Sequence, residues 1–459
     1  MTTTVGELKG EARVLVRAGE LGAALAAYDH VLAHNPLDYG CRMNIADLLA
    51  GLGDAGGAGA VYRALALHNL RAGHPAPAIV CCKELERLGQ MTDDIVAELA
   101  STYAQGAPAL ARFAARQAPV EESARLPRPD LTGTEPVTAI APRARARALD
   151  FSVYTGYPQH HLPLAFLSEL PAPVFAPVIR ALKVQRLSDG DLVIREGEPG
   201  VAFYLVAAGQ VRVFATDSLG RQTERARLHE AALFGEMSLL TAQPRTASVQ
   251  VVGEADIVEV GRDALNALAA EIPAMGAALD RFARERLLKN LLATSPLFRP
   301  FNRQQQMDLV RRFDGHEVDA GTEIIREGGP GLGLFVVLAG EVEVTKRQPP
   351  AAGPAGAGAG VTAAAEVSLA RLRAGEVFGE MSLINNQPTS ASVRAARRST
   401  ILFLARDYFQ RLVEALPEIR RYFEELSARR GMESQLVLGS TDQTAPEDDG
   451  DQRDERILI

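Results

Sequence analysis

The spacing of hydrophobic and polar residues divides the chain into segments of different character. Residues 1–115 are rich in alanine and leucine at helical spacing, which predicts a domain of short helices. Residues 116–158 are rich in proline, arginine and other polar residues with little apolar periodicity, so we expect an extended or disordered linker. From residue 159 onward, short β-rich runs alternate with glycine turns roughly every eight to twelve residues, which is typical of a compact antiparallel β-roll.

The β-rich pattern occurs twice. Equivalent residues are separated by 131 positions in the first part of the two copies and by 144 positions in the rest, so the second copy carries an insert of 13 residues. The matched pairs are Gly190 and Gly321, Glu196 and Glu327, Gly209 and Gly340, Leu268 and Leu412, and Pro273 and Pro417. The insert is an alanine-, glycine- and proline-rich loop from Gln348 to Gly360. Apolar residues at helical spacing follow Arg262 and Arg406, so helices are expected after each roll.

The helical segment contains an internal repeat. Three pairs of equivalent residues lie 34 positions apart, and they are Gly19 and Gly53, Ala24 and Ala58, and Tyr28 and Tyr62. The glycines precede a second helix, the alanines let two helices approach closely, and the tyrosines fill the groove between them. This pattern resembles the tetratricopeptide repeat, which implies a small solenoid whose concave face holds a peptide or another protein. An ordinary helical bundle with a coincidental period is the alternative.

Together these patterns predict an α+β chain, in which an N-terminal α-helical repeat domain precedes two antiparallel jelly-roll domains with flanking helices. A chain of 459 residues is too long for one ordinary hydrophobic core, which agrees with several domains. The predicted boundaries are 1–115 for the helical domain, 116–158 for the linker, 159–292 and 293–431 for the two rolls, and 432–459 for an acidic, disordered tail.

The most specific motif is Phe-Gly-Glu-Met-Ser-Leu, which occupies residues 234–239 and recurs at residues 378–383. The first copy continues with Pro-Arg-Thr-Ala-Ser at residues 244–248, whereas the second has Pro-Thr-Ser-Ala-Ser at residues 388–392. The first copy resembles the phosphate-binding cassette of cyclic nucleotide-binding domains, and the resemblance covers roughly residues 160–430. The tandem order also resembles the regulatory subunit of cyclic-AMP-dependent protein kinase.

The resemblance implies a ligand site in the first roll, made by Gly235, Glu236, Met237, Ser238, Arg245 and Thr246. A short helix beginning near Gly235 presents free backbone N–H groups to an anion, and Arg245 offers a charged donor fork to the cyclic phosphate. Glu236 would accept a hydrogen bond from the ribose 2′-hydroxyl, and Ser238 and Thr246 would add contacts to the phosphate. The alternative is that Glu236 and Arg245 form a structural ion pair inside the roll.

The second roll keeps Gly379, Glu380 and Ser382 but has Thr389 at the position of Arg245. Threonine cannot balance the charge of a desolvated phosphate, and losing a charged partner in a buried site costs about 2–5 kcal/mol. We therefore expect the second site to be weak, altered or purely structural. Thr389→Arg is the substitution expected to create binding there.

The residue after the cassette arginine bears on the choice of base. Thr246 resembles the residue with which several cyclic-GMP-binding members contact guanine. Bacterial cyclic-AMP binders also carry hydroxyls at this position, and we favour cyclic AMP over cyclic GMP as the ligand.

Composition narrows the function. The formal net charge of −8 argues against a protein that coats nucleic acid. The N-terminal residues lack a leader pattern and no stretch approaches ~20 apolar residues, so we expect a soluble, cytoplasmic protein without membrane contact. Cys41, Cys81 and Cys82 lack metal-ligand spacing, which predicts small buried hydrophobes and no metal site. We expect no catalytic residues and no enzyme, because no nucleophile, base and orienting residue occur at a recognised spacing.

These features favour a non-enzymatic signalling adaptor, in which the first roll binds a cyclic nucleotide and relays the change to an unknown protein held by the helical repeats. A scaffold with degenerate, non-binding rolls is the alternative. A transcription factor like the catabolite activator protein would need a DNA-reading helix-turn-helix, and only an acidic tail follows Arg430.

One basic segment lies where kinase regulatory subunits carry an inhibitory sequence. It reads Arg145-Ala146-Arg147 and lacks an adjacent arginine pair. An unstructured basic linker is therefore the preferred interpretation, and a kinase-blocking role is the alternative.

Overall fold

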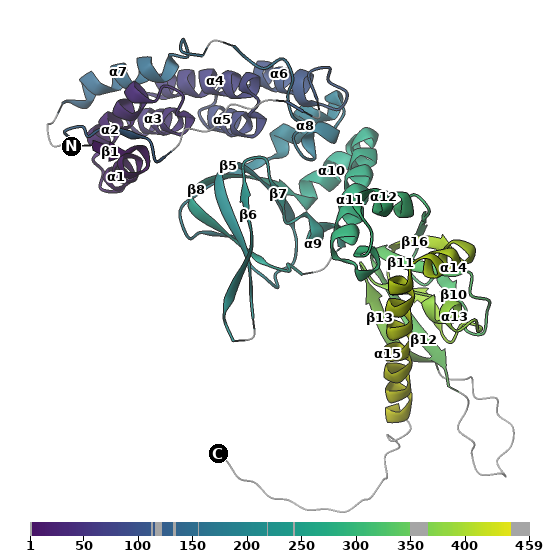
Figure 1. Ribbon diagram of the computed structural model, residues 1–459. Helices are drawn as coiled ribbons and strands as arrows, with labels where there is room; N and C mark the ends of the chain where they lie inside the picture. Colours follow the sequence, from purple (N-terminus) through teal and green to yellow (C-terminus); the bar gives the residue numbers. More distant parts are fainter. Residues whose placement is uncertain are drawn as a thin grey trace, which may run out of the picture. The chain divides into compact units, whose positions relative to one another are not determined.

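The computed structural model of the chain describes residues 2–111, 113–114, 122–131, 135–154, 156–217, 219–241, 244–348 and 366–441. The chain forms two compact units, Met1–Ala283 and Arg284–Ile459. The first contains the N-terminal helices and the first β-roll, and the second contains the second β-roll (Figure 1).

The N-terminal region consists of antiparallel helix pairs. Its six helices are α1 (Val5–Arg17), α2 (Leu21–His34), α3 (Tyr39–Gly51), α4 (Ala55–Ala72), α5 (Pro75–Arg87) and α6 (Asp93–Tyr103). The side chains of Asp38 and Asp54 accept hydrogen bonds from free backbone N–H groups at the starts of α3 and α4. Gly73 ends α4 in the left-handed conformation, with φ of 94°. Short polar caps and glycine thus separate the helices.

The residues that recur 34 positions apart lie in the core of these pairs. Ala24, Ala58, Tyr28 and Tyr62 are all at most 2% exposed, as expected for close helix packing. The three cysteines are also buried, which confirms that they are small core residues. The pairing of helices agrees with the predicted repeat domain, and its assignment to the tetratricopeptide repeat stays a prediction.

The segment expected to be an extended linker contains a helix. Helix α7 (Val137–Leu149) packs mainly against α2, with further contacts to α3 and α4, and β2 (Arg125–Pro127) pairs with β1 (Thr2–Thr4). The prediction of extended chain is therefore wrong for α7. Its alanines favour a helix, and one apolar stripe is buried against the N-terminal helices, which offsets the interior proline at position 142.

The first roll is one antiparallel sheet flanked by helices. Strands β3 (Lys183–Leu187), β8 (Ser248–Gly261), β5 (Ala202–Thr216) and β6 (Gln222–His229) pair in that order, β4 (Leu192–Ile194) pairs with β8, and β7 (Leu233–Phe234) pairs with β5. The helical elements are η1 (Leu167–Glu169), α8 (Ala172–Ala181), α9 (Glu236–Thr241), α10 (Arg262–Glu271) and α11 (Pro273–Thr294). Phe166, Phe203 and Phe282 pack ring against ring beneath the sheet, which joins it to the helices.

The second roll repeats this plan in two four-stranded sheets. One has the order β10 (Glu323–Ile325), β15 (Ser392–Ala395), β12 (Glu341–Arg347), β13 (Glu366–Arg373), and the other β14 (Val377–Phe378), β11 (Gly333–Ala339), β16 (Ser399–Ala405), β9 (Asp314–Val318). The helical elements are η2 (Pro296–Phe298), α12 (Arg303–Val310), α13 (Glu380–Ile384), α14 (Arg406–Ala415) and α15 (Pro417–Thr441). The predicted α+β class, with helices after each roll, is confirmed.

Two predicted segments extend beyond the described residues. The insert in the second roll lies between β12 and β13, and residues 349–365 are not described. Helix α15 runs to Thr441, so the disordered tail predicted from residue 432 is wrong for its first part, and residues 442–459 lie outside the described chain.

Candidate functional site

The cassette of the first roll begins at a tight turn between β7 and α9. Gly235 has φ of 80°, a backbone conformation that side chains disfavour. A Cβ atom at this position would also lie 2.8 Å from Nη1 of Arg245 and 2.8 Å from Cδ1 of Ile194. The backbone conformation therefore favours glycine here, and a side chain would also displace the ends of two neighbouring side chains, one of them the arginine that the sequence selects.

Arg245 is a buried cation held by neutral acceptors. Its side chain is 6% exposed. Nη1 donates to the carbonyl of Gly235 and, at 2.7 Å, to Oγ of Ser238, and Nη2 donates to the carbonyl of Ala202 at 2.7 Å. Burial lowers the pKa of Arg245, although an arginine stays protonated at neutral pH. These three hydrogen bonds of Arg245 all go to neutral acceptors, while the carboxylates of Glu198 and Glu236 favour its charged form.

The backbone of Arg245 is fixed as well. Its N–H donates to the carbonyl of Glu198 at 2.8 Å, and its own carbonyl accepts from the N–H of Gly197 at 2.9 Å. In the same turn, a Cβ atom on Gly200 would lie 2.4 Å from Oγ of Ser238. The turn that precedes β5 thus lies directly against the cassette and positions its arginine.

The remaining predicted residues lie at different depths. Ser238 is 6% exposed and donates to the carbonyl of Gly235 at 3.3 Å. Glu236 and Met237, in the first turn of α9, are partly buried, and Thr246 is exposed. The structure therefore brings Gly235, Ser238 and Arg245 into one hydrogen-bonded group, and it places Thr246 at the surface.

Sequence reasoning missed three contributors to this group. They are the carbonyl of Ala202, the turn at residues 197–200, and the Tyr204 ring, whose centroid lies 5.8 Å from the Arg245 guanidinium carbon. The glycines offered a usable signal, since Gly197 and Gly200 recur as Gly328 and Gly331 at the offset of 131. A backbone carbonyl leaves no such signal.

The second cassette has the same turn, and its glutamate is paired with an arginine. Gly379 has φ of 84°, and the hydroxyl of Ser382 donates to its carbonyl at 2.9 Å. Glu380 is 2% exposed, and its Oε1 accepts a hydrogen bond from Nη1 of Arg430 in α15 at 2.8 Å. The same guanidinium nitrogen donates to the carbonyl of Val377 at 2.7 Å. A residue of the chain's own helix α15 therefore pairs with the carboxylate of Glu380.

Thr389 keeps the backbone contacts of the arginine that it replaces. Its N–H donates to the carbonyl of Gly329 at 2.9 Å, and its carbonyl accepts from Gly328 at 2.8 Å. Its hydroxyl donates to the carbonyl of Arg326 at 2.5 Å. A cavity of about 300 Å³ lies beside Thr389 and Ser382. The second roll thus preserves the loop geometry and lacks the cation.

Comparison with known proteins agrees with this architecture. The family profile described as cyclic nucleotide-binding domain matches residues 184–271 and 316–415, which are the two rolls. The chain therefore consists of an N-terminal helical region followed by two cyclic nucleotide-binding domains with flanking helices. The pair is similar to the regulatory parts of cyclic-nucleotide-dependent protein kinases.

Three similar proteins are informative. Isozyme 1 of the cGMP-dependent protein kinase of Drosophila melanogaster is 30% identical over 256 residues, which are 56% of this chain and 30% of that protein. The type II regulatory subunit of the cAMP-dependent protein kinase of the same organism is 25% identical over 53% of this chain and 58% of that protein. The regulatory domain of Toxoplasma gondii PKA, solved with cAMP, is 24% identical over 57% of this chain and 92% of that one, with a TM-score of 0.26. The chain thus spans less than two thirds of the length of the two Drosophila relatives.

The described helices were also compared with what a bilayer requires. Within the described ranges, none is both long enough and apolar enough to cross a membrane.

Proposed function

We propose that the protein is a non-enzymatic signalling adaptor whose first roll binds a cyclic nucleotide and whose helical repeats hold a protein partner. The observation that carries this proposal is Arg245, a buried cation whose bonds to Gly235, Ser238 and Ala202 use only neutral acceptors. A buried cation whose hydrogen bonds go to neutral acceptors favours an anionic ligand, because the phosphate balances the charge and accepts the same donor fork.

The ligand would exchange with these internal contacts. The cyclic phosphate would accept from the Arg245 fork and from the Ser238 hydroxyl, and Glu236 at the start of α9 would accept from the ribose 2′-hydroxyl. Cyclic AMP is favoured over cyclic GMP. The names of the relatives include both cyclic-AMP-dependent and cyclic-GMP-dependent kinases, so the base is decided by titration.

Charged contacts within the first unit offer a route from the roll to the helices. Arg186 in β3 donates to Asp47 of α3 at 2.6 Å and to Asp256 of β8 at 3.0 Å. His74, before α5, bonds to Glu230 after β6 at 2.7 Å. A ligand that changes the sheet would alter these contacts, and it would shift the equilibrium only as far as its affinities for the two states differ.

The scaffold alternative applies best to the second roll. Its Glu380 is bonded to Arg430, and Thr389 supplies no cation. We propose that this roll has a structural role.

Calorimetric titration of the full chain with cyclic AMP and with cyclic GMP tests the proposal. We expect one site per chain, loss of that site in Arg245→Ala, and unchanged binding in the matched variant Thr389→Ala. If neither nucleotide gives heat or a shift in Tm, the adaptor proposal is wrong and the scaffold alternative holds.

A further inference from the structure

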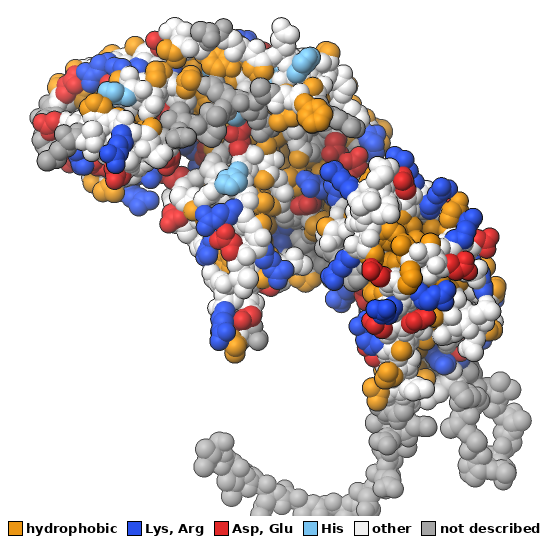
Figure 2. All heavy atoms as spheres, in the orientation of Figure 1, with side chains coloured by type: hydrophobic (Ala, Val, Ile, Leu, Met, Phe, Trp, Pro, Cys, Tyr) orange, Lys and Arg blue, Asp and Glu red, His pale blue; other side chains and the backbone are white. Residues whose placement is uncertain are grey.

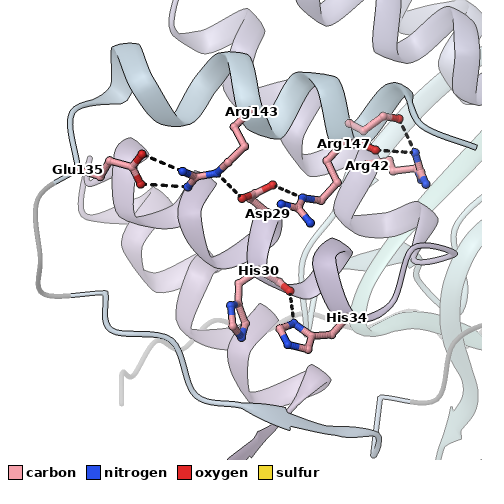
Figure 3. Close-up of polar contacts among 8 residues, drawn as sticks. Asp29, His30, His34, Arg42, Glu135, Arg143 and Arg147 are labelled. Atoms are coloured by element: carbon pink, nitrogen blue, oxygen red, sulfur yellow. Dashed lines mark hydrogen bonds and ion pairs between the residues drawn. The ribbon is translucent and has the colours of Figure 1, made fainter.

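Helix α7 is held on the N-terminal helices by arginines that meet one buried carboxylate. Asp29 of α2 is 5% exposed. Its Oδ2 accepts from Nε of Arg143 at 2.9 Å, and its Oδ1 accepts from Nε of Arg147 at 2.7 Å (Figure 3). The two arginines are four positions apart and therefore project from the same side of the helix. Asp29 is thus positioned to bind two arginines four positions apart on one helix, and its selectivity depends on that spacing as well as on positive charge.

A second buried charge holds the carboxyl end of α7. Arg42 of α3 is 1% exposed. Its Nη1 donates to the carbonyl of Ala148 at 2.5 Å, and its Nη2 donates to the carbonyl of Asp150 at 2.7 Å. Carbonyls at a helix end lack partners within the helix and carry partial negative charge, so a cation is favoured there. Arg42 therefore contacts the carbonyls at the end of α7, and its guanidinium carbon also lies 4.0 Å from the centroid of the Phe151 ring.

The surface between these two charges fits a helix with small side chains. Ile140, Ala144 and Ala148 recur at intervals of four and are at most 2% exposed. Below them, a Cβ atom on Gly22 of α2 would lie 2.9 Å from Cγ2 of Val137, and one on Gly57 of α4 would lie 2.9 Å from Cδ of Arg145. Gly22 thus leaves room for Val137, whereas a Cβ atom on Gly57 would first meet Asp54 at the start of its own helix. The buried Ala144 and Ala148 show that small side chains of α7 lie against these helices.

The outer side of α7 is exposed to solvent. The Arg143 and Arg147 side chains are 44% and 37% exposed, in contrast to the buried Asp29. Figure 2 shows basic side chains gathered over the end of the helical region where Figure 1 places α7. Ion pairs with an exposed partner contribute little to stability. Helix α7 is therefore held mainly by its close packing and by the cost of leaving the buried charges of Asp29 and Arg42 without partners.

We propose that the surface formed by α2, α3 and α4, with Asp29 and Arg42 at its centre and end, is a docking site for a helix of the protein partner. That helix carries two arginines four positions apart beside a stripe of alanine-sized residues. Helix α7 is the occupant that the chain supplies itself, and the partner helix displaces it. This inference rests on the proposed function only in assigning the helical region a protein partner, and it does not depend on nucleotide binding by the first roll.

The test uses the full chain and a labelled synthetic peptide of residues 135–152. In the variant R143E/R147E, repulsion from Asp29 should release α7 and leave the surface open. Fluorescence anisotropy without nucleotide should then show binding of the wild-type peptide to the variant. The same peptide should bind the wild-type chain with an apparent affinity lower by roughly tenfold or more, because apparent affinity scales with the fraction of open sites. A peptide with both arginines changed to glutamate is the matched control and should not bind the variant. Equal binding to both chains, or no binding to a folded variant, overturns the proposal.

A second measurement covers a variant that does not fold. Hydrogen exchange of the wild-type chain should show faster exchange of the α7 amides when the wild-type peptide is in excess, and no change with the glutamate peptide. If saturating wild-type peptide leaves α7 exchange unchanged, the helix is a permanent part of the domain and the inference is wrong. Calorimetry with cyclic nucleotide is a separate readout, so failure of the adaptor proposal is distinguished from failure of this one.

Discussion

The guanidinium of Arg430 donates a hydrogen bond to the carboxylate of Glu380, with 2.8 Å between Nη1 and Oε1, inside the second roll. The glutamate lies at the position that, in the first roll, we assign to the ribose hydroxyl. Helix α15 thus satisfies from within the chain a group that a ligand would otherwise satisfy. This contact explains how a cassette without its arginine can remain a stable part of a roll.

Removing Arg430 should destabilise the second roll. Arg430→Ala leaves the carboxylate of Glu380, which is 2% exposed, without its cation, and breaking a buried pair in this way costs about 3 kcal/mol. Urea unfolding of the full chain should show the loss. Arg429→Ala is the matched control on the exposed side of α15 and should have little effect. Glu380→Gln in the Arg430→Ala background should recover part of the loss, and equal effects of the two arginine variants would contradict the structural role.

Restoring the arginine of the second cassette should not be sufficient for strong binding. In the background Arg245→Ala, which silences the first site, we expect Thr389→Arg to bind cyclic nucleotide more weakly than the wild-type first site, because Arg430 still holds Glu380. Adding Arg430→Gln should strengthen binding, since it frees the carboxylate for the ribose. Calorimetry on both combinations measures this order. Wild-type affinity in Arg245→Ala/Thr389→Arg would show that the ion pair does not obstruct the site.

The shape of the cation in the first site should matter as much as its charge. Arg245→Lys keeps a positive charge but cannot reach Gly235, Ser238 and Ala202 at once, because an ammonium lacks the planar fork. We expect cyclic nucleotide affinity to fall by roughly 10- to 1000-fold, measured as Kd. Arg195→Lys, at an exposed position before the same turn, is the control for arginine loss as such. Unchanged affinity in Arg245→Lys would show that charge alone is recognised.

His68 predicts a pH dependence of stability in the helical region. It is 2% exposed and bonds to the hydroxyls of Tyr39 and Tyr157, at 2.9 Å each. Burial lowers its pKa to about 4, below the usual value of about 6.5. The unfolded chain therefore binds a proton that the folded chain excludes, and the stability present above pH 6.5 is lost as pH falls toward 4.

The His68 contribution can be isolated by substitution. Between pH 7 and pH 5 we expect a loss of about 1–2 kcal/mol in the free energy of unfolding, allowing for solvent screening. His68→Gln should remove this part of the dependence, whereas the exposed His34→Gln should leave it intact. The comparison is made by urea unfolding at both pH values. Parallel pH profiles for wild type and His68→Gln would refute the assignment.

The rolls and their cassettes could be predicted because they depend on local sequence. The two motifs lie 144 positions apart, and each has a glycine, Gly235 or Gly379, followed by a glutamate. The glycines recur because each backbone turn tolerates few residues. The neutral environment of Arg245 could not be foreseen, since two of its three acceptors are backbone carbonyls. The structure therefore adds these acceptors to the residues that the motif selects, and the binding role of those residues stays a prediction.

Features that depend on distant partners were missed. The segment of α7 resembles a polar linker because its arginines dominate the composition. Two of these arginines pair with Asp29, more than 100 positions earlier, and Arg145 pairs with Asp54. Likewise, the carboxylate of Glu380 is paired by a residue 50 positions away in what the sequence suggested was the end of a domain. Charge pairs of this kind have no periodicity, so pattern analysis of one sequence does not reveal them.

The position of the 13-residue insert explains how the two copies could diverge in length. Thr216 pairs with Gln222 in the first roll, and the equivalent residues Arg347 and Glu366 pair in the second, so the chain leaves and re-enters the sheet at adjacent points. Lengthening such a hairpin adds mainly loop-closure entropy, about 0.6 kcal/mol for each doubling. The β12–β13 tip is therefore the natural place to graft a reporter or an affinity tag, because evolution has already lengthened the chain there while both cassettes kept their register.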